Sequence, residues 1–388
     1  MRKNMTEKLS SLLPDVINEV TTGFEELTNI RNGSNKQNFW YIILLLSCIG
    51  IRYMLIFLVG MPMCQNKDYL ESINEFSINV MRRATVIDTV PWFLRNIVSY
   101  FLKNSTVEDV IMTHIGREFE ARQKARWFQS SYDIVVSDAI QWILDAAPPE
   151  TPILKLVQKL MLFNFASIHT SSISLAHILY DLAANPEFQD PVCAEIEEVL
   201  RAEGGWTKQA LTKMRKLDSI FRESLRMNGT NIVTLIRKVI TPYTFIDGTF
   251  VSKGAWVGAA TINIHYSPDL YKDPEKFDGF RFYKKRQLEG NAHHFQMASP
   301  TLDYLPFGFG KNSCPGRFFA SNELKIAVAY ILCNYQLRLN GGTTGERPQN
   351  IYDGLVCLPN PTVGIELKER EGRQKSILYP GHMASYGN

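Results

Sequence analysis

A single cysteine lies in a short loop in which glycines and aromatic residues recur. Four positions follow the spacing Phe-x-x-Gly-x-x-x-Cys-x-Gly, namely Phe307, Gly310, Cys314 and Gly316. A cysteine ligates a metal only as a thiolate that is shielded from water and oxidants. Glycine lets the backbone turn tightly and approach another group where a Cβ would collide. The pattern therefore indicates a ligating thiolate, and its alternative is a buried structural cysteine in a turn before a helix.

An apolar helical pattern follows directly behind this loop, from about Arg317 to Leu332. The first turn of a helix carries amide groups without intrahelical partners and the positive end of the helix dipole. Both would favour an anionic sulfur at Cys314. We expect the phenyl ring of Phe307 to cover that sulfur.

The loop resembles the haem-ligand loop of cytochromes P450. The resemblance implies a haem b cofactor whose iron is ligated by the thiolate of Cys314, with Phe307, Gly310 and Gly316 around it. In such enzymes the thiolate pushes electron density onto the iron and promotes O–O cleavage. The likeness covers about residues 57–368 and is closest to fungal secondary-metabolite members.

The resemblance also predicts how the propionates of the haem are held. Asn312 departs from the family, in which His or Arg commonly binds a propionate at this position. Arg237, in a β-like run, aligns with a family arginine that pairs with a propionate. A surface arginine on a strand is an equal alternative. We therefore expect Arg237 to be the main remaining anchor and haem binding to be weaker than usual.

The longest helical pattern, Thr151 to Ala184, contains a small and polar patch at residues 166–171, Ala-Ser-Ile-His-Thr-Ser. This patch resembles the oxygen-activating kink of the P450 distal helix. Thr170 matches the family threonine, so we expect it to bond a carbonyl one turn back and to relay a proton. Ser167 replaces the usual glycine. His169 replaces the usual acid, and it is either a second proton relay or a hydrogen-bonded helix residue. Helix packing is the alternative for the whole patch.

A carboxylate and two arginines are expected to form a buried triad. Glu223 and Arg226 are three residues apart, hence on one face of a helix, which alone is a weak signal. In P450s a second arginine, here Arg281, joins this pair beneath the cysteine loop. A buried carboxylate needs charge-assisted partners of this kind.

Composition limits the alternatives. The chain has 388 residues, of which 45% are hydrophobic and 21% charged, so it can bury a large core. Its formal net charge of +3 and the absence of a basic run interleaved with aromatic residues argue against nucleic-acid binding. Its six cysteines form no C-x-x-C pair, which argues against a disulfide framework and for a reducing compartment.

The apolar run from Phe39 to Gly60 is long enough to span a bilayer. Arg52 lies near its middle, where a charge costs about 2.5–3.5 kcal/mol on insertion scales. We therefore favour a buried helix over a transmembrane segment. Before this run, an amphipathic helix is expected within residues 1–36, with an apolar face of Leu9, Leu12, Leu13, Val16, Val20 and Phe24.

We expect a mainly α fold with small β-sheets, the cytochrome P450 fold, incomplete at its N-terminus. The predicted divisions are residues 1–150 as a remnant of the N-terminal helical half, residues 151–368 as the haem-binding core and residues 369–388 as a loose tail. Short strands are expected at residues 231–239, 243–245, 249–251, 335–339 and 362–367.

The resemblance implies a monooxygenase that oxidises a small lipophilic secondary metabolite, with a terpenoid or indole-derived skeleton. It would use O2 and electrons from an NADPH–cytochrome P450 reductase, with Lys311 and Arg317 steering the partner by charge. The family location is the cytoplasmic face of the endoplasmic reticulum membrane. Two alternatives stay open: a truncated, inactive remnant with weak or no haem binding, and a membrane-inserted protein that is not an enzyme.

Overall fold

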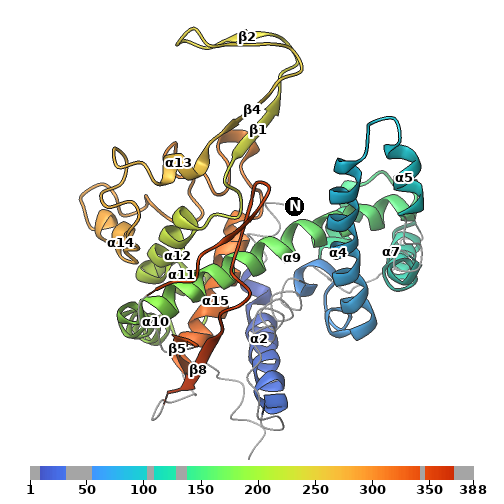
Figure 1. Ribbon diagram of the computed structural model, residues 1–388. Helices are drawn as coiled ribbons and strands as arrows, with labels where there is room; N and C mark the ends of the chain where they lie inside the picture. The colour runs from blue at the N-terminus through green and yellow to red at the C-terminus, as the bar shows by residue number, and fades with distance from the viewer. Residues whose placement is uncertain (1–8, 32–54, 103–108, 128–137, 341–345, 371–388) are drawn as a thin grey trace, which may run out of the picture. The chain divides into compact units, whose positions relative to one another are not determined.

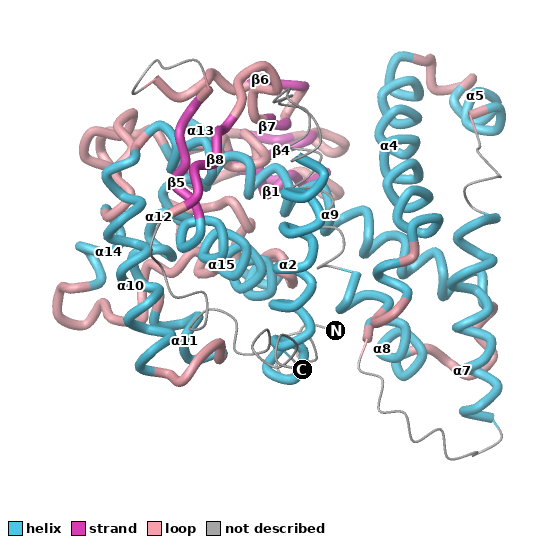
Figure 2. The backbone as a smooth tube through the Cα atoms, turned by 90° about the horizontal axis from the view of Figure 1, so that it is seen from below, coloured by secondary structure: helices cyan, strands magenta, loops and turns pink. Residues whose placement is uncertain are grey.

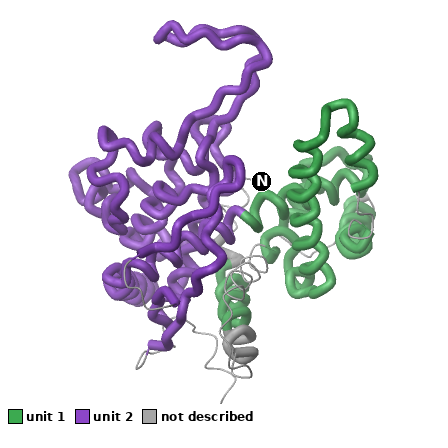
Figure 3. Tube along the Cα trace, viewed as in Figure 1, with its two compact units in different colours: residues 1–24, 47–169 green, residues 25–46, 170–388 purple. Residues whose placement is uncertain are grey.

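The computed structural model describes residues 9–31, 55–102, 109–127, 138–340 and 346–370. Helices dominate these residues, and short strands accompany them (Figure 1). The chain forms two compact units, residues 1–24 with 47–169 and residues 25–46 with 170–388 (Figure 3). The division falls within two helices, after residue 24 in Leu9–Arg31 and between His169 and Thr170 in Ile153–Ala184. The sequence patterns suggested a division after residue 150.

Helices joined by short turns make up the part of the first unit that the structure describes. Residues 55–59 and 109–111 also lie in helices. The named elements are α2 (Leu9–Arg31, as far as residue 24), η1 (Met63–Gln65), α4 (Lys67–Thr89), α5 (Arg95–Phe101), the π-helical turn η2 (Met112–Gly116), α7 (Arg117–Trp127), α8 (Ala139–Ala146) and the first part of α9 (Ile153–Ala184).

Helix α2 has the apolar face that its periodicity predicts. Leu13, Val16, Val20 and Phe24 are each no more than 2% exposed. The predicted face is therefore buried. The predicted contributions of Leu9 and Leu12 lie among side chains that are not described.

Asp138 begins helix α8 and ties it to α7. Its carboxylate accepts the amide of Gln141 at 2.9 Å, which satisfies one of the donors that a helix start leaves open. The same carboxylate accepts two hydrogen bonds from the Arg122 guanidinium, at 2.6 and 2.8 Å. One acidic residue thus serves both as helix cap and as the partner of a half-buried arginine.

Most of the apolar run at residues 39–60 lies outside the described residues. Its last turn, residues 55–59, is helical and at most 4% exposed. Among the helices that the structure describes, none combines the length and the apolar character needed to cross a bilayer.

The second unit holds the end of α2, the remaining helices and every strand among the described residues. Figure 2 shows these strands in magenta. Its helices, after the end of α9, are η3 (Pro186–Phe188), α10 (Gln189–Ala202), α11 (Lys208–Lys213), α12 (Arg215–Met227), α13 (Thr261–His265), α14 (Arg281–Arg286), η4 (Gly310–Asn312) and α15 (Arg317–Asn334). Its strands are β1 (Thr234–Lys238), β2 (Tyr243–Thr244), β3 (Phe250–Val251), β4 (Trp256–Ala259), β5 (Tyr335–Leu339), β6 (Ile351–Asp353), β7 (Val356–Leu358) and β8 (Ile365–Glu369).

The described strands pair into four antiparallel two-stranded sheets: β1 with β4, β2 with β3, β5 with β8, and β6 with β7. Strand β5 coincides with the predicted residues 335–339, and β8 begins three residues later than predicted. Strands β4, β6 and β7 were not predicted. Each is four residues or fewer, too short for an alternating pattern to stand out.

Helix α15 runs through the core of the second unit. Its buried residues surround the helix, from Phe319 through Leu324 and Val328 to Cys333. An apolar helix that is buried on nearly all sides must be enclosed by other elements. Helices α10, α11 and α12 and strand β5 contact it. The helix behind the cysteine loop is thereby held rigidly.

The sheets β1–β4 and β2–β3 form a ribbon that extends away from the helices of its unit (Figure 1). Large apolar side chains along it are exposed, among them Ile240, Ile246, Phe250 and Trp256. The base of the ribbon, at Leu235, is the part that approaches the cysteine loop.

Candidate functional site

The cysteine loop is a closed turn at the start of α15. The amide of Cys314 donates to the carbonyl of Phe307 at 2.8 Å, and the amide of Ser313 donates to Gly310 at 3.1 Å. Gly308 and Gly310 both have φ of 68°. This left-handed conformation favours glycine because it has no Cβ. The loop therefore brings the half-buried Cys314 next to the start of a helix.

Gly316 differs from the expectation that it helps the chain to turn. Its φ is −86°, which any residue adopts, and the left-handed turns are at Gly308 and Gly310. A Cβ on Gly316 would lie 3.9 Å from the Cys314 sulfur. The glycine thus keeps space open at the sulfur, whereas Gly308, which the sequence analysis did not single out, makes the turn.

Arg317 is not available to steer a partner, contrary to the sequence expectation. Its side chain is buried, with Nε donating to the Ala298 carbonyl at 3.0 Å and Nη1 donating to the Cys314 carbonyl at 2.8 Å. The arginine therefore fixes the loop from inside. Lys311 is exposed and remains the basic residue on the loop surface.

Strand β1 touches the cysteine loop. A Cβ on Gly308 would lie 3.6 Å from a methyl carbon of Leu235, which itself has a left-handed φ of 55°. Arg237 follows two residues along the strand; it is exposed and donates to the neighbouring Ile236 carbonyl at 2.8 Å. Arg237 therefore lies two residues along β1 from the contact with the loop and is exposed.

Glu223 meets both of the arginines that the sequence analysis assigned to it. Arg226 donates to its two carboxylate oxygens at 2.8 and 2.9 Å, and Arg281 donates to Oε1 at 3.0 Å. The amide of Asp278 adds a further hydrogen bond at 3.2 Å. Glu223 and Arg226 are fully buried in α12, and Arg281 begins α14. The charged groups compensate one another, as a buried site requires.

His265 links this triad to the chain that leads into the cysteine loop. Its Nδ1 lies 2.8 Å from the Arg226 carbonyl, and its Nε2 accepts the amide of Leu305 at 3.0 Å. Burial lowers the pKa of His265 to about 4, so the ring is neutral. A neutral ring has one donor and one acceptor, which fits both contacts. His265 is thus a buried, hydrogen-bonded core residue.

Arg222 is a structural residue that sequence reasoning missed. It is fully buried, donates to the carbonyls of Gln296 and Ser299 at 2.6 and 2.8 Å, and stacks 3.8 Å from the ring centre of Tyr304. It anchors the segment that precedes the loop. An arginine beside the Glu-x-x-Arg pair looks like an ordinary solvated charge in the sequence, so only the surrounding aromatic residues could have signalled it.

Helix α9 continues as a regular helix through residues 166–171. The hydroxyl of Ser167 donates to the Phe163 carbonyl at 2.7 Å, and that of Ser174 donates to the Thr170 carbonyl at 2.8 Å. Both serines thus make the backbone contact one turn back that is also expected of Thr170. The side chain of Thr170 is exposed.

His169 packs against the edge of Phe165, with ring centres 6.2 Å apart. Its Nε2 is buried and has no hydrogen-bond partner among the described residues. Burial lowers the pKa of its imidazole. His169, immediately before Thr170, therefore has a ring nitrogen that could accept or donate a further hydrogen bond.

Ser171 connects α9 to α15. Its hydroxyl donates to the carboxyl of Glu323 at 3.2 Å, and both side chains are buried. Burial raises the pKa of Glu323 to about 8, so this carboxyl is largely protonated near neutral pH. The helix that carries Thr170 is thus joined to the helix that starts at the cysteine loop. Sequence reasoning missed Glu323, which sits in an apolar helix without any motif.

The first unit contains an apolar pocket of about 410 Å³. Arg83 is the one charged residue among those that line it, and Gln158 is the other strongly polar one. The remaining lining residues are Phe76, Val80, Met112, Leu154, Val157, Met161, Leu162 and Phe165. The volume is within the range of small-molecule sites.

Comparison with known proteins identifies the class. A family model described as Cytochrome P450 matches residues 1–365. Cytochrome P450 monooxygenase 71 of Postia placenta is 36% identical over 380 residues, which cover 96% of this chain and 74% of that protein. Cytochrome P450 monooxygenase AN1598 of Emericella nidulans is 30% identical over 384 residues, covering 95% and 70%. Retinoic acid-bound CYP120A1, a cyanobacterial structure, superposes with a TM-score of 0.70 at 22% identity, covering 95% and 78%.

The chain belongs to the cytochrome P450 family. It has the fold of that family, and it is an oxidoreductase of the monooxygenase class, as its relatives are. The family implies haem with a cysteine thiolate as ligand, a redox partner, O2 and a small substrate.

The residues at the loop fit such a group. Cys314 is half-buried at a helix N-terminus, and the missing Cβ of Gly316 leaves space 3.9 Å from its sulfur. Arg317 donates to the Cys314 carbonyl through Nη1 and to the Ala298 carbonyl through Nε, which fixes the backbone of the loop. A cofactor ligated by sulfur needs a ligand whose backbone is fixed in this way.

Proposed function

We propose that this protein is a haem-thiolate monooxygenase with Cys314 as the iron ligand and haem b as the cofactor. Its reaction is RH + O2 + two electrons + two protons, giving ROH and water. The substrate is a small lipophilic secondary metabolite with a terpenoid or indole-derived skeleton. The observation that carries the proposal is the cysteine loop, closed by the Cys314–Phe307 hydrogen bond and open at the sulfur beside Gly316.

The chemistry that the cofactor supplies when bound is the activation of O2 by an iron with a thiolate ligand. The protein residues do the remaining work. Thr170, an exposed residue of α9, delivers the proton, and His169 immediately before it has a ring nitrogen without a hydrogen bond among the described residues. Glu223, Arg226 and Arg281 hold the segments beneath the loop. Arg237 binds a carboxylate of the cofactor.

The lining of the apolar pocket in the first unit suits a lipophilic molecule. Arg83 is the one charged residue among those that line it, so the pocket has few partners for the polar groups of a charged or highly polar molecule. Aromatic and methionine side chains such as Phe76, Phe165 and Met161 suit a rigid hydrocarbon or aromatic skeleton. The skeleton class itself rests on the likeness to fungal secondary-metabolite members of the family.

Electrons come from an NADPH–cytochrome P450 reductase that docks near the cysteine loop. The exposed Lys311 supplies positive charge there, and an acidic surface on the reductase would complement it. We place the enzyme at the cytoplasmic face of the endoplasmic reticulum membrane, because a lipophilic substrate partitions into that membrane and the family reductase is found there.

The test is the CO-difference spectrum of the reduced full chain, produced with haem present. We expect the red-shifted band of a thiolate-ligated haem in the parent and in Cys64→Ser, which changes a buried cysteine of the first unit. Cys314→Ser should lose this band. Circular dichroism of the variants establishes that each has folded.

Two results would overturn the proposal. A Cys314→Ser protein that keeps the red-shifted band would remove the assigned ligand. A folded parent that binds no haem, or binds it with the band elsewhere, would instead support an inactive member of the family.

A further inference from the structure

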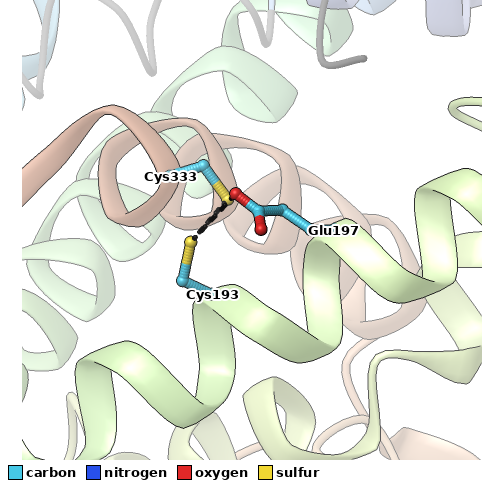
Figure 4. Close-up of side chains that lie close together, drawn as sticks. All are labelled: Cys193, Glu197 and Cys333. Atoms are coloured by element: carbon cyan, nitrogen blue, oxygen red, sulfur yellow. Dashed lines mark hydrogen bonds between the residues drawn. The ribbon is translucent and has the colours of Figure 1, made fainter. Parts of the chain in front are cut away.

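Two cysteines and a glutamate meet where α10 packs against α15 (Figure 4). The thiol of Cys193 lies 3.3 Å from the sulfur of Cys333. Both side chains are buried, at 0% and 1% exposure. The residues are 140 positions apart in the chain, so folding alone brings the two sulfurs together.

Glu197 completes the cluster from one turn further along α10. Its Oε1 lies 3.8 Å from the Cys193 sulfur, and the three candidate ligand atoms all lie within 4.8 Å of one another. The glutamate is half-buried, while both sulfurs are enclosed. The cluster is therefore open to solvent on the side of the carboxylate and closed by protein on the side of the sulfurs.

We propose that Cys193, Cys333 and Glu197 bind a zinc ion, or another thiophilic divalent cation, that clamps α10 to α15. Thiolates and a carboxylate are zinc ligands with bonds of about 2.3 and 2.0–2.2 Å. Zinc is usually tetrahedral in proteins, so a water molecule on the open side would provide the fourth ligand. Thiolate ligands select zinc over the hard cations magnesium and calcium.

The sulfur–sulfur distance favours a metal site over a disulfide. Two sulfurs bound to one tetrahedral zinc lie about 3.8 Å apart, given bonds of about 2.3 Å. The observed 3.3 Å needs an opening of about 0.5 Å to reach this value. A disulfide bond of about 2.05 Å would require the sulfurs to close by roughly 1.2 Å, within two packed helices. The carboxylate of Glu197 would be a ligand of a cation, whereas a disulfide would not involve it.

This site is distinct from the proposed haem ligand. Cys333 lies near the end of α15, whereas Cys314 precedes its first residue, Arg317. The 16 steps from Arg317 to Cys333 correspond to about 24 Å along a helix axis. The zinc ion would therefore stabilise the far end of the helix whose other end supports the cysteine loop.

The experiment measures zinc and iron separately in the purified full chain. The protein is equilibrated with zinc sulfate, dialysed against a weak chelator and analysed by inductively coupled plasma mass spectrometry. We expect one zinc per chain in the parent and a zinc dissociation constant raised more than about 100-fold in Cys193→Ser and Cys333→Ser, since even groups behind the ligands cost 10–100-fold. Glu197→Gln should raise it at least about 10-fold.

Two control variants match these changes outside the cluster. Glu198→Gln alters an exposed carboxylate next to Glu197, and Cys64→Ser alters a buried cysteine of the first unit. Both should bind zinc as the parent does. Parent-like zinc binding in all three cluster variants would overturn the proposal.

Absorption spectroscopy at the zinc K-edge tests the parent without any variant, and haem iron does not interfere with it. Two sulfur ligands at about 2.3 Å with lighter oxygen ligands would support the site. A shell without sulfur, a chain that retains no zinc, or a Cys193–Cys333 disulfide found by mass spectrometry would each refute it.

Discussion

Nε of Arg281 lies 3.0 Å from Oε1 of Glu223, although the two residues are 58 positions apart in the chain. This contact joins the start of α14 to the middle of α12, and Arg226 holds the same carboxylate from within α12. Because Glu223 is fully buried, its charge depends on these two partners.

Replacing Glu223 with Gln should therefore be strongly destabilising. The change leaves Arg226, which is 0% exposed, without its carboxylate, and breaking a buried pair in this way costs about 3–5 kcal/mol. Urea denaturation followed by circular dichroism measures the free energy of unfolding. Lys284→Gln is the control, because its ion pair with Asp278 is exposed and should contribute no more than about 1 kcal/mol. Equal losses in the two variants would contradict this account.

Removing the hydroxyl of Thr170 should divert electrons from product to peroxide. In a system reconstituted with reductase and NADPH, Thr170→Ala is expected to release a severalfold larger share of hydrogen peroxide per NADPH than the parent. A positioned proton donor contributes a factor of the order of 10² to the rate of proton transfer, so this transfer slows without the hydroxyl. The reduced oxygen is then released as hydrogen peroxide and forms no product. Thr170→Ser keeps the hydroxyl and should resemble the parent. If Thr170→Ala is as well coupled as the parent, the threonine is a packing residue.

Glu323 predicts a slope of stability with pH. Its ordinary pKa of 4.5 is raised to about 8 by burial in the folded protein. Between these values the folded state keeps a proton that the unfolded state has lost, so stability falls as pH rises, by about 1.4 kcal/mol per pH unit. Glu323→Gln carries no such proton, so its free energy of unfolding should depend less on pH over this interval.

The measurement is urea denaturation at several pH values between the two pKa values. Glu198→Gln changes an exposed carboxylate and should leave the slope of the parent intact. A Glu323→Gln protein with the parental slope would show that the buried carboxyl does not titrate as stated.

Lys311 should matter for electron transfer more than for folding. Reversing its charge in Lys311→Glu is expected to raise the KM for the reductase severalfold at low ionic strength, with the difference shrinking as salt screens the charges. Steady-state NADPH oxidation against reductase concentration gives this KM. Lys208→Glu changes another basic residue that is exposed in the second unit and remote in sequence from the loop, and it serves as the control. Identical salt dependence in both variants would exclude docking at the loop.

Periodicity predicted the long helices well because their patterns extend over many turns. Helix α9 begins two residues later than expected and ends at the expected Ala184, and α15 begins at the expected Arg317. The short strand β4 was missed, since it offers only Trp256 to Ala259. Short segments gain their structure from pairing with partners such as β1, which a local pattern does not contain.

Charged residues in the core were the hardest to predict. Asp218 bridges Arg286 at 3.1 Å and Lys325 at 2.8 Å, and all three are buried. In the sequence each looks like part of a solvated helix face, because burial is decided by tertiary packing. Glu223 and its arginines were predicted only through resemblance to a family.

The division of the chain within α9 has a practical consequence for recombinant fragments. A fragment that starts at Thr170 would begin in the middle of Ile153–Ala184 and expose amide groups that now bond to the preceding turn. The hydrogen bond from Ser174 to the Thr170 carbonyl would then sit in a fraying first turn. A fragment meant to contain the Cys314 loop without the first unit should therefore start before Pro152, so that it includes the whole of α9.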